Sequence, residues 1–328
     1  MKKPQLVFAC NIADENARKR IEQWVDIKEV TVDSPQSLLE ECRDADGIIV
    51  GYTSHPMITR EVIDGVAGLR LVGTTYGGVR QNVDDQYALS SGLTVIHTGA
   101  SRVRPMAQYT LALILSSLMH IHLYHHDMRA GEQWPRFKYP RGRILQDRSV
   151  GVIGYGRIGE GIVRMLQSFT SHVAVCSRHL SAEVAADARV SLKSLNELCA
   201  DAEIIVLAGG YNPETHHMIG REQFARMQQD ALFVNIARGK MVHEAALIEA
   251  LQASKIYAAL DVFEEEPLPA DSPLRQSDRV LLTPHRANNA IEFEQRWETL
   301  ADEIEAFYSG KQPDSSLNAE RARAMSES

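Results

Sequence analysis

Short apolar runs rich in β-branched residues alternate with amphipathic stretches, and this alternation constrains the fold more than any other feature. The first series lies at 5–9, 29–32, 47–50, 69–73 and 93–97; the second lies at 150–153, 173–176, 204–207, 232–236, 256–260 and 280–282. A parallel strand is reached through a crossover, and a helix is the usual content of a crossover. The sequence therefore predicts an α/β fold with two domains, each built on a parallel sheet.

Two longer helical patterns interrupt these series. One covers 105–129 and is followed by a connection rich in glycine, proline and arginine that reaches residue 147, which predicts a bridging helix and a loop. The other covers 291–308 and precedes a polar tail, 314–328, whose composition predicts little contribution to a core. The total of 328 residues suits two domains.

Charge and hydropathy exclude several classes of partner. A total of 35 basic and 43 acidic residues gives a net charge of −8, which disfavours nucleic acid as the main ligand. The most apolar stretch, 111–119, is interrupted by Ser116 and Ser117 and falls short of the ~20 residues that cross a bilayer. The N-terminus lacks the apolar segment of a signal peptide. We therefore expect a cytoplasmic protein with no membrane partner.

Neither the cysteines nor the histidines have the spacing of a metal site. The closest of the four cysteines, Cys176 and Cys199, are 23 positions apart, and Cys10 and Cys42 are more distant still. We expect all four to be reduced core thiols. The histidines within 120–126 have helical neighbours, but no complete ligand set accompanies them, so we expect no metal.

The strongest local motif is GYGRIG at 154–159, which follows an apolar run and precedes an apolar helical pattern. Glycines at these spacings let a strand turn sharply into a helix, so that backbone N–H groups and the helix N-terminus face a pyrophosphate. An ordinary glycine-rich turn is the alternative, but the flanking strand and helix favour a dinucleotide site. The predicted cofactor contacts here are Gly154, Gly156, Arg157, Ile158 and Gly159.

The end of the next strand bears on the choice of dinucleotide. An NAD site usually carries an acidic residue there, which accepts hydrogen bonds from the ribose 2′-OH. This chain has Ser177 at that position, followed by Arg178. Without the carboxylate there is no repulsion, and a guanidinium binds a 2′-phosphate well. We therefore expect NADP(H) to be preferred and NAD(H) to be possible, with a solvated surface arginine as the alternative.

Seven motifs, taken in order, resemble the D-isomer-specific 2-hydroxyacid dehydrogenase family, which includes glyoxylate/hydroxypyruvate reductases and phosphoglycerate dehydrogenases. The resemblance runs from residue 5 to about 312. It implies a flavodoxin-like substrate domain and an NAD(P)-binding Rossmann domain. The motifs lie at 69–84, 97–113, 150–159, 212–219, 234–251, 259–269 and 281–285.

The resemblance identifies Arg238, Glu266 and His285 as catalytic residues. Reduction of a 2-keto acid needs a cation for the carboxylate and the ketone, which an arginine supplies, and a proton donor that works near neutral pH, which an imidazole supplies. A glutamate bonded to the second ring nitrogen would orient that imidazole and stabilise its charged form. Taken singly, each residue has a structural alternative: a surface cation, part of an acidic run, or a loop histidine.

Further contacts follow from the same resemblance. Ile236, Arg238, Asp261 and His285 are expected beside the cofactor, and Arg238 and His285 also beside the substrate. The backbone N–H groups of Gly77 and Gly78 match those that hold the substrate carboxylate in the family.

Two segments near the expected site depart from the family pattern. One is 79–81, Val-Arg-Gln, and the other is 286–289, Arg-Ala-Asn-Asn. Arg80, Arg102 and Arg104 are candidates to meet a second anion on the substrate, although a solvated role is the simpler interpretation.

These observations predict a substrate-binding domain of residues 1–100 and 288–328, and an NAD(P)-binding Rossmann domain of residues 101–287. The resemblance also implies a homodimer, with 108–119 and the arm that follows as contacts.

The predicted activity is hydride transfer between NAD(P)H and a small 2-keto acid of the glyoxylate or hydroxypyruvate type, which makes the protein a D-2-hydroxyacid dehydrogenase acting on CH–OH groups. Two alternatives remain. One is a dehydrogenase of the same fold for an unusual substrate, such as phosphite or a larger anionic hydroxy acid. The other is a non-catalytic module that senses nucleotides.

Overall fold

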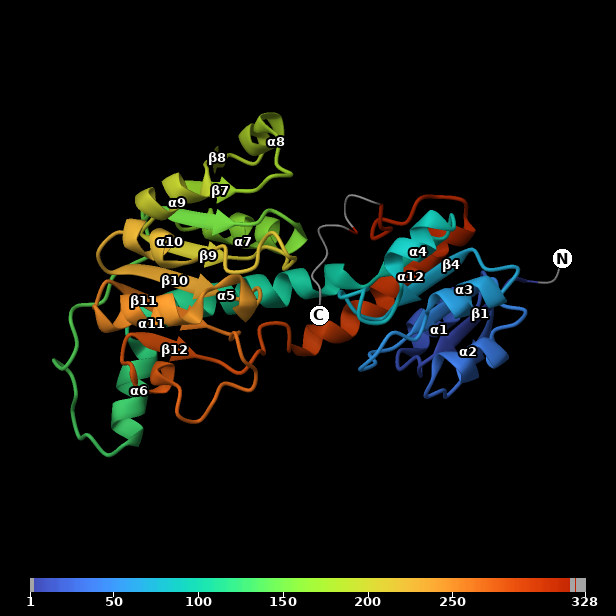
Figure 1. Ribbon diagram of the computed structural model, residues 1–328, viewed down its shortest axis with the longest axis horizontal. Coiled ribbons are helices and arrows are strands. Elements are labelled where there is room, and N and C mark those ends of the chain that lie inside the picture. The colour runs from blue at the N-terminus through green and yellow to red at the C-terminus, as the bar shows by residue number, and fades with distance from the viewer. Residues whose placement is uncertain (1–2, 319–321, 323–328) are drawn as a thin grey trace. The chain divides into compact units, whose positions relative to one another are not determined.

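The computed structural model describes residues 3–318 and 322, which divide into two compact units (Figure 1). Unit 1 contains the described residues up to Arg102 and from Ala290 onward, and unit 2 spans Val103–Asn289. The chain therefore passes between the units twice. The sequence predicted boundaries after residues 100 and 287, each two residues before the boundary in the structure.

Unit 1 is built on a five-stranded parallel sheet in the order β2-β1-β3-β4-β5. This is the flavodoxin-like order, so the predicted fold class is confirmed for this unit. The strands are β1 (Gln5–Ala9), β2 (Asp26–Glu29), β3 (Gly47–Val50), β4 (Leu71–Thr74) and β5 (Thr94–His97). Its helices are α1 (Glu15–Ile21), α2 (Pro35–Glu41), α3 (Arg60–Gly65), α4 (Asp85–Ser90), α12 (Arg296–Tyr308) and the 3₁₀ turns η1 (Gly99–Arg102) and η4 (Ile291–Gln295).

Unit 2 is built on a seven-stranded parallel sheet in the order β12-β11-β10-β9-β6-β7-β8. The order reverses between β9 and β6, as it does in a Rossmann fold, which confirms the second predicted domain type. The strands are β6 (Val150–Ile153), β7 (Val173–Cys176), β8 (Ser191–Leu192), β9 (Ile204–Leu207), β10 (Ala231–Asn235), β11 (Ile256–Leu260) and β12 (Val280–Leu282). The helices are α5 (Val103–Leu118), α6 (Ile121–Arg129), α7 (Arg157–Leu166), α8 (Ala182–Asp187), α9 (Leu195–Asp201), α10 (Arg221–Arg226), α11 (Glu244–Gln252), η2 (Gly239–Met241) and η3 (Pro273–Gln276).

Both faces of the unit 2 sheet are covered, as expected of a parallel sheet. Neighbouring residues of β10 point to opposite faces, so that Phe233 packs in one buried cluster with α9, α10 and α11, whereas Leu232 and Val234 pack in another with α5 and α7. The strands are therefore apolar throughout, which explains why they were recognisable in the sequence as continuous runs.

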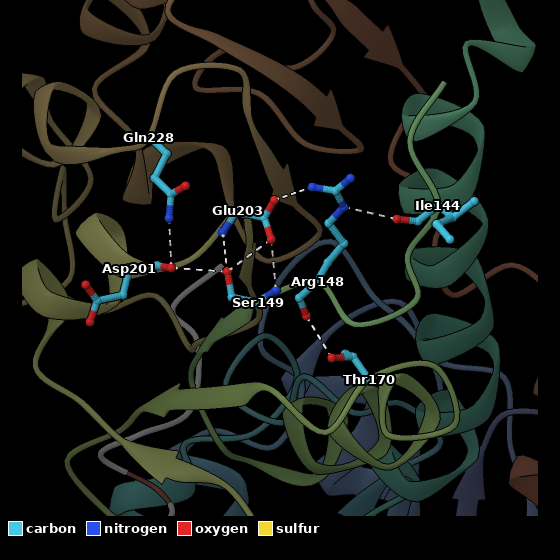
Figure 2. Close-up of polar contacts among 7 residues, drawn as sticks. All are labelled: Ile144, Arg148, Ser149, Thr170, Asp201, Glu203 and Gln228. Atoms are coloured by element: carbon cyan, nitrogen blue, oxygen red, sulfur yellow. Dashed lines mark hydrogen bonds and ion pairs between the residues drawn. The ribbon is translucent and has the colours of Figure 1, made fainter. Parts of the chain in front are cut away.

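A polar network joins the amino ends of β6 and β9, where the chain enters the sheet after residue 147 (Figure 2). Glu203 accepts hydrogen bonds from the backbone and hydroxyl of Ser149 and pairs with Arg148, whose Nε donates to the carbonyl of Ile144 at 3.2 Å. Burial alone would raise the pKa of Glu203, but the bonds from Arg148 and Ser149 outweigh it and hold that pKa below its ordinary value. This network lies at the amino ends of the strands and leaves the carboxyl ends free for chemistry.

The long helix expected over 105–129 is two helices. α5 ends at Leu118, α6 begins at Ile121, and the two axes differ by 70°. His120 lies between them with a φ of 54°, a left-handed conformation that an α-helix cannot contain. The apolar periodicity continues through this break, which is why the sequence pattern did not reveal it.

Two other expectations need correction. The strand expected at 29–32 lies at Asp26–Glu29, because the backbone of these residues pairs in register with β1 from Gln5 onward. The tail after residue 314 was expected to contribute little to a core, yet Ser315, Ser316 and Leu317 are buried. Residues 319–321 and 323–328 of that tail lie outside the described residues.

No single helix among residues 3–318 is long and apolar enough to cross a membrane. The segment 99–118 and α6 together pass the length and composition criteria, as a bent pair.

The buried tail generates a stability prediction. The backbone N–H of Leu317 donates to the carbonyl of Val95 at 2.9 Å, and the Leu317 side chain packs in the core of unit 1 with 7% of its surface exposed. Leu317→Ala should therefore lower the free energy of unfolding of unit 1 by about 2–4 kcal/mol. Urea denaturation measures the change, and Ile291→Ala, at an exposed isoleucine of unit 1, is the control. A loss no larger than that of the control would contradict the assigned packing.

Candidate active site

The glycine turn follows β6 and begins α7. Gly154 has a φ of 99°, and its N–H donates to the carbonyl of Cys176 at 2.8 Å. A Cβ on Gly154 would lie 2.5 Å from Cα of Gly209, and one on Gly159 would lie 2.2 Å from the carbonyl oxygen of Gly154. Both positions therefore require glycine, the first for the turn and the second for close packing of helix on strand.

The middle glycine serves a different purpose. A Cβ on Gly156 would meet no atom of the described chain within 4 Å, so its backbone faces open space at the N-terminus of α7. A phosphate can approach such a backbone closely, and the helix N-terminus favours its charge. Arg157 and Ile158 are the first residues of that helix. The turn thus fits the pyrophosphate of a dinucleotide.

Ser177 and Arg178 follow β7. Ser177 Oγ accepts a hydrogen bond from the N–H of His179, and Arg178 Nη1 forms an ion pair with Glu214, a residue of the loop after β9. The hydrogen bond from Arg178 holds the pKa of Glu214 below its ordinary value. Sequence reasoning missed this glutamate: it lies within the recognised motif at 212–219, but 36 positions separate it from Arg178, and spacing alone does not bring the two together.

His285 and Glu266 form the central pair of the site. Nδ1 of His285 lies 2.7 Å from Oε2 of Glu266, and the backbone N–H of Phe263 donates to the other carboxylate oxygen at 3.0 Å. Each oxygen of Glu266 thus has a separate partner. The bond from Phe263 fixes the carboxylate to its own loop, and the contact with His285 fixes it beside the imidazole. Because Nδ1 faces Glu266, Nε2 is the ring nitrogen that points elsewhere. Both side chains are part-exposed, so a small molecule can reach the imidazole.

The loop that carries His285 is held by Asp261, which directly follows β11. One oxygen of Asp261 accepts hydrogen bonds from Thr283 Oγ1 at 2.7 Å and from the N–H of Arg286 at 2.9 Å; the other accepts from the N–H of Ala287 at 2.8 Å. The N–H of His285 donates to the Asp261 carbonyl at 2.7 Å. Asp261 is 1% exposed. Its carboxylate therefore positions the histidine loop, and its expected contact with the cofactor stays a prediction.

Arg238 follows β10 and lies near Glu266. Burial lowers the pKa of its guanidinium, and the charge of Glu266 acts in the opposite direction. A guanidinium is a cation at neutral pH. Its Nη1 donates to the carbonyl of Ala237 at 2.8 Å. A Cβ on Gly239 would lie 1.7 Å from the Phe263 carbonyl oxygen, so the turn after Arg238 packs directly on the loop that ends at Glu266. The structure thus brings together all three predicted catalytic residues within unit 2.

Ile236, the remaining cofactor candidate, follows β10 directly and is 3% exposed. Its side chain packs in the core cluster that includes α5 and α7. What it presents at the end of the strand is backbone.

Gly77 and Gly78 belong to unit 1, where they follow β4. A Cβ on Gly77 would lie 3.1 Å from Cα of Gly99, whereas one on Gly78 would meet nothing within 4 Å, so the Gly78 backbone faces open space. Arg102 lies beside this loop, with its guanidinium carbon 5.5 Å from the ring centre of Tyr76.

The nearby departures from the family pattern have structural partners. Arg80 binds both oxygens of the buried Asp85, at 3.1 and 3.2 Å, and the carbonyl of Ala322 at 2.6 Å. Gln81 donates to the carbonyl of Thr53 at 3.1 Å. The Arg80 side chain therefore anchors unit 1.

The chain is similar to several known proteins. The model of the D-isomer-specific 2-hydroxyacid dehydrogenase NAD-binding domain matches residues 111–287. A D-3-phosphoglycerate dehydrogenase of Methanocaldococcus jannaschii is 35% identical over 93% of this chain, which spans 57% of the length of that relative. A glyoxylate reductase of Pyrococcus furiosus is 31% identical over 92% of this chain and 89% of its own. A solved structure, the PH0520 protein of Pyrococcus horikoshii, has a TM-score of 0.81 at 27% identity and covers 97% of this chain and 96% of its own.

The chain belongs to the D-isomer-specific 2-hydroxyacid dehydrogenase family, a class of nicotinamide-dependent oxidoreductases. Unit 2 contains the NAD-binding domain of that family, and the glycine turn after β6 is the part of it that fits the dinucleotide.

The hydrogen bonds of Asp261 predict that this carboxylate positions the loop of His285. In Asp261→Asn, one carboxylate oxygen becomes an amide that cannot accept, so at least one buried N–H or hydroxyl of the 283–287 loop loses its partner. This should cost about 1–3 kcal/mol of unfolding free energy and lower kcat because His285 loses its fixed position. Thermal denaturation and steady-state kinetics measure the two effects, with Asp271→Asn, at an exposed aspartate, as control. Wild-type stability and kcat in Asp261→Asn would refute the positioning role.

Proposed function

We propose that this protein is an NADPH-preferring reductase that converts small 2-keto acids of the glyoxylate or hydroxypyruvate type to D-2-hydroxy acids. The 2.7 Å contact between the imidazole of His285 and the carboxylate of Glu266, beside the cation of Arg238, carries this proposal. It is the arrangement that reduction of a keto acid requires: an oriented proton donor and a charge that holds the acid.

Each residue has a defined task. When bound, the reduced nicotinamide supplies the hydride to C2 of the substrate. His285 donates a proton from Nε2 to the ketone oxygen, so that a C–H bond and an O–H bond form as the C=O double bond becomes single. Glu266 accepts from Nδ1 and stabilises the charged imidazole from which the proton leaves. Arg238 binds the substrate carboxylate and polarises the ketone.

The backbone of Gly77 and Gly78 in unit 1 is proposed, on the family resemblance, to bind a carboxylate. Its support is the open space at the Gly78 position and the absence of a side chain at either residue. A backbone N–H binds carboxylates without regard to the rest of the substrate, so this loop supports the class of substrate and not one member of it.

The proposed preference for NADPH is supported by the two residues that follow β7. Ser177 occupies the position of the usual acid, and the exposed Arg178 can bind a phosphate. Both Arg178 and its partner Glu214 are exposed, and an exposed ion pair is weak enough for a phosphate to displace it.

The relatives favour this function over the two alternatives. The relative from Pyrococcus furiosus that aligns over 92% of this chain is a reductase of glyoxylate, a small keto acid. A module that only sensed nucleotides would have no use for the oriented histidine, and here Asp261 and Glu266 together bind its loop and its ring.

The proton-donor role is tested by His285→Ala. Loss of the general acid should lower kcat about 100- to 10,000-fold on glyoxylate or hydroxypyruvate, followed by the absorbance of NADPH. Glu266→Gln should lower it less, because the imidazole keeps its place in the loop. Circular dichroism of both variants controls for folding. Activity of His285→Ala within tenfold of wild type would refute the assignment.

We also propose a homodimer formed through residues 108–119 and the arm that follows, which contains α6 and reaches about residue 147. The large exposed apolar side chains of this segment support the proposal, because side chains of this kind are typical of an interface when they gather on one surface. Trp134 is 74% exposed and Phe137 is 85% exposed; the others are Met119, Ile121, Met128 and Ile144.

Gel filtration tests the dimer. The wild type should elute with the mass of two chains, and a variant with Trp134→Ser and Phe137→Ser should shift toward the mass of one. Ile291→Ser, at an exposed isoleucine outside the arm, should leave the elution unchanged. A wild type that elutes as one chain would remove the proposal.

A cytoplasmic location is proposed on the state of the cysteines. All four are free thiols, and burial raises the pKa of the Cys42 and Cys199 thiols to about 12, which keeps them protonated and unreactive. Cell fractionation checks the location.

A further inference from the structure

Arg178 and Glu214 come from different crossovers and meet at the end of β7. Nη1 of Arg178 contacts Oε2 of Glu214, and the two side chains are 64% and 69% exposed. Exposure means that a ligand can reach both members of the pair. Their meeting point lies next to Ser177, the position at which many dinucleotide sites carry an acid for the adenosine ribose.

Local hydrogen bonds fix the turn that presents Glu214. Oδ1 of Asn212 accepts from the N–H of Glu214 at 3.0 Å and from that of Thr215 at 3.1 Å. Oγ1 of Thr215 accepts from the N–H of Asn212 at 2.8 Å and donates to the carbonyl of Gly210 at 3.1 Å. Such an Asx turn holds its backbone without help from a ligand, so Glu214 is presented by a preformed loop.

The same loop starts beside the glycine turn. Gly209 lies so close to Gly154 that a Cβ on Gly154 would be 2.5 Å from Cα of Gly209. The N–H of Gly154 also donates to the carbonyl of Cys176, the last residue of β7. The pyrophosphate turn, the end of β7 and the loop that carries Glu214 are therefore one connected set of backbone segments.

We propose that Glu214 is a specificity-determining residue, which competes with the 2′-phosphate of NADP(H) for Arg178. The inference rests on the proposed cofactor preference. A carboxylate and a phosphate bind the same donor groups of a guanidinium, so both cannot hold it fully at once. NADPH must displace Glu214 or bind beside its negative charge. NADH carries only a hydroxyl at this position and leaves the pair intact.

The consequence is a moderated preference. Arg178 strengthens the binding of NADPH relative to NADH. Glu214 reduces this difference in binding free energy, because the ion pair with Arg178 must be broken before the phosphate can bind. The carboxylate stays ionised because the hydrogen bond from Arg178 lowers its pKa. Since exposed ion pairs are weak, the effect on affinity amounts to a few-fold and falls as salt is added.

Glu214→Gln tests the proposal, because it removes the charge and keeps the size of the side chain. The dissociation constants of NADPH and NADH are measured by titration of nicotinamide fluorescence on the full-length protein, without substrate. The NADPH constant should fall about two- to fivefold, and the NADH constant should stay the same. Addition of salt should bring the wild-type and variant values for NADPH closer together.

Two further variants isolate the cause. Glu249→Gln removes the same charge from another exposed pair, with Arg221 on α10, and should change neither constant. In an Arg178→Ala background there is no guanidinium to compete for, so Glu214→Gln removes only the repulsion between Glu214 and the phosphate. The gain in NADPH affinity should therefore be clearly smaller than the gain in the wild-type background.

Three results would overturn the proposal: an unchanged NADPH constant in Glu214→Gln, equal gains for NADPH and NADH, or the full gain without Arg178. The binding assay also separates this inference from the proposed function. A selective gain for NADPH in a protein that turns over none of the keto acids would retain the role of Glu214 and refute the reductase. A wild-type protein that binds neither dinucleotide would refute both.

Discussion

The parallel alignment of the unit 2 sheet is the constraint on which the rest of this site depends. The last residues of neighbouring strands pair with one another: Ile153 with Cys176 and Leu207, and Asn235 with Leu207 and Leu260. The strands therefore end level, and every segment that follows a strand emerges at the same edge. The glycine turn, Arg178, Arg238, Glu266 and His285 come from five such segments, which is why residues more than a hundred positions apart emerge at the same edge.

Two carboxylates divide the work of placing the imidazole. Asp261 binds the Thr283 hydroxyl before His285 and the backbone N–H groups of Arg286 and Ala287 after it, and Glu266 binds the ring itself. The φ of 51° at His285 turns the chain into a conformation that side chains other than glycine rarely adopt, and the bonds to Asp261 hold it there. Backbone and ring are thus fixed separately. An imidazole held in this way need not be reoriented when a substrate arrives.

Much of this could be predicted from the sequence, and the exceptions have separate physical causes. The strands were recognisable because parallel strands buried on both faces are continuous apolar runs, and the glycine spacing was recognisable because it reflects a local turn. The break at His120 was missed because apolar periodicity continues across it. The bonds of Asp261 and the pairing of Arg178 with Glu214 depend on strand order and register, which spacing does not contain. Arg80 was a candidate for substrate contact, whereas the structure pairs it with Asp85, a buried acid five positions away.

The two ends of the proposed dinucleotide site also differ in how much stability a substitution costs. Where the chemistry takes place, Asp261 is buried and fully bonded, and loss of any one partner leaves a buried polar group without its bond. At the adenosine end, Arg178 and Glu214 are exposed, and substitution of either costs little stability. In the proposed function, cofactor selectivity therefore depends on exposed residues that can vary independently of the fold, whereas the reaction depends on residues that cannot.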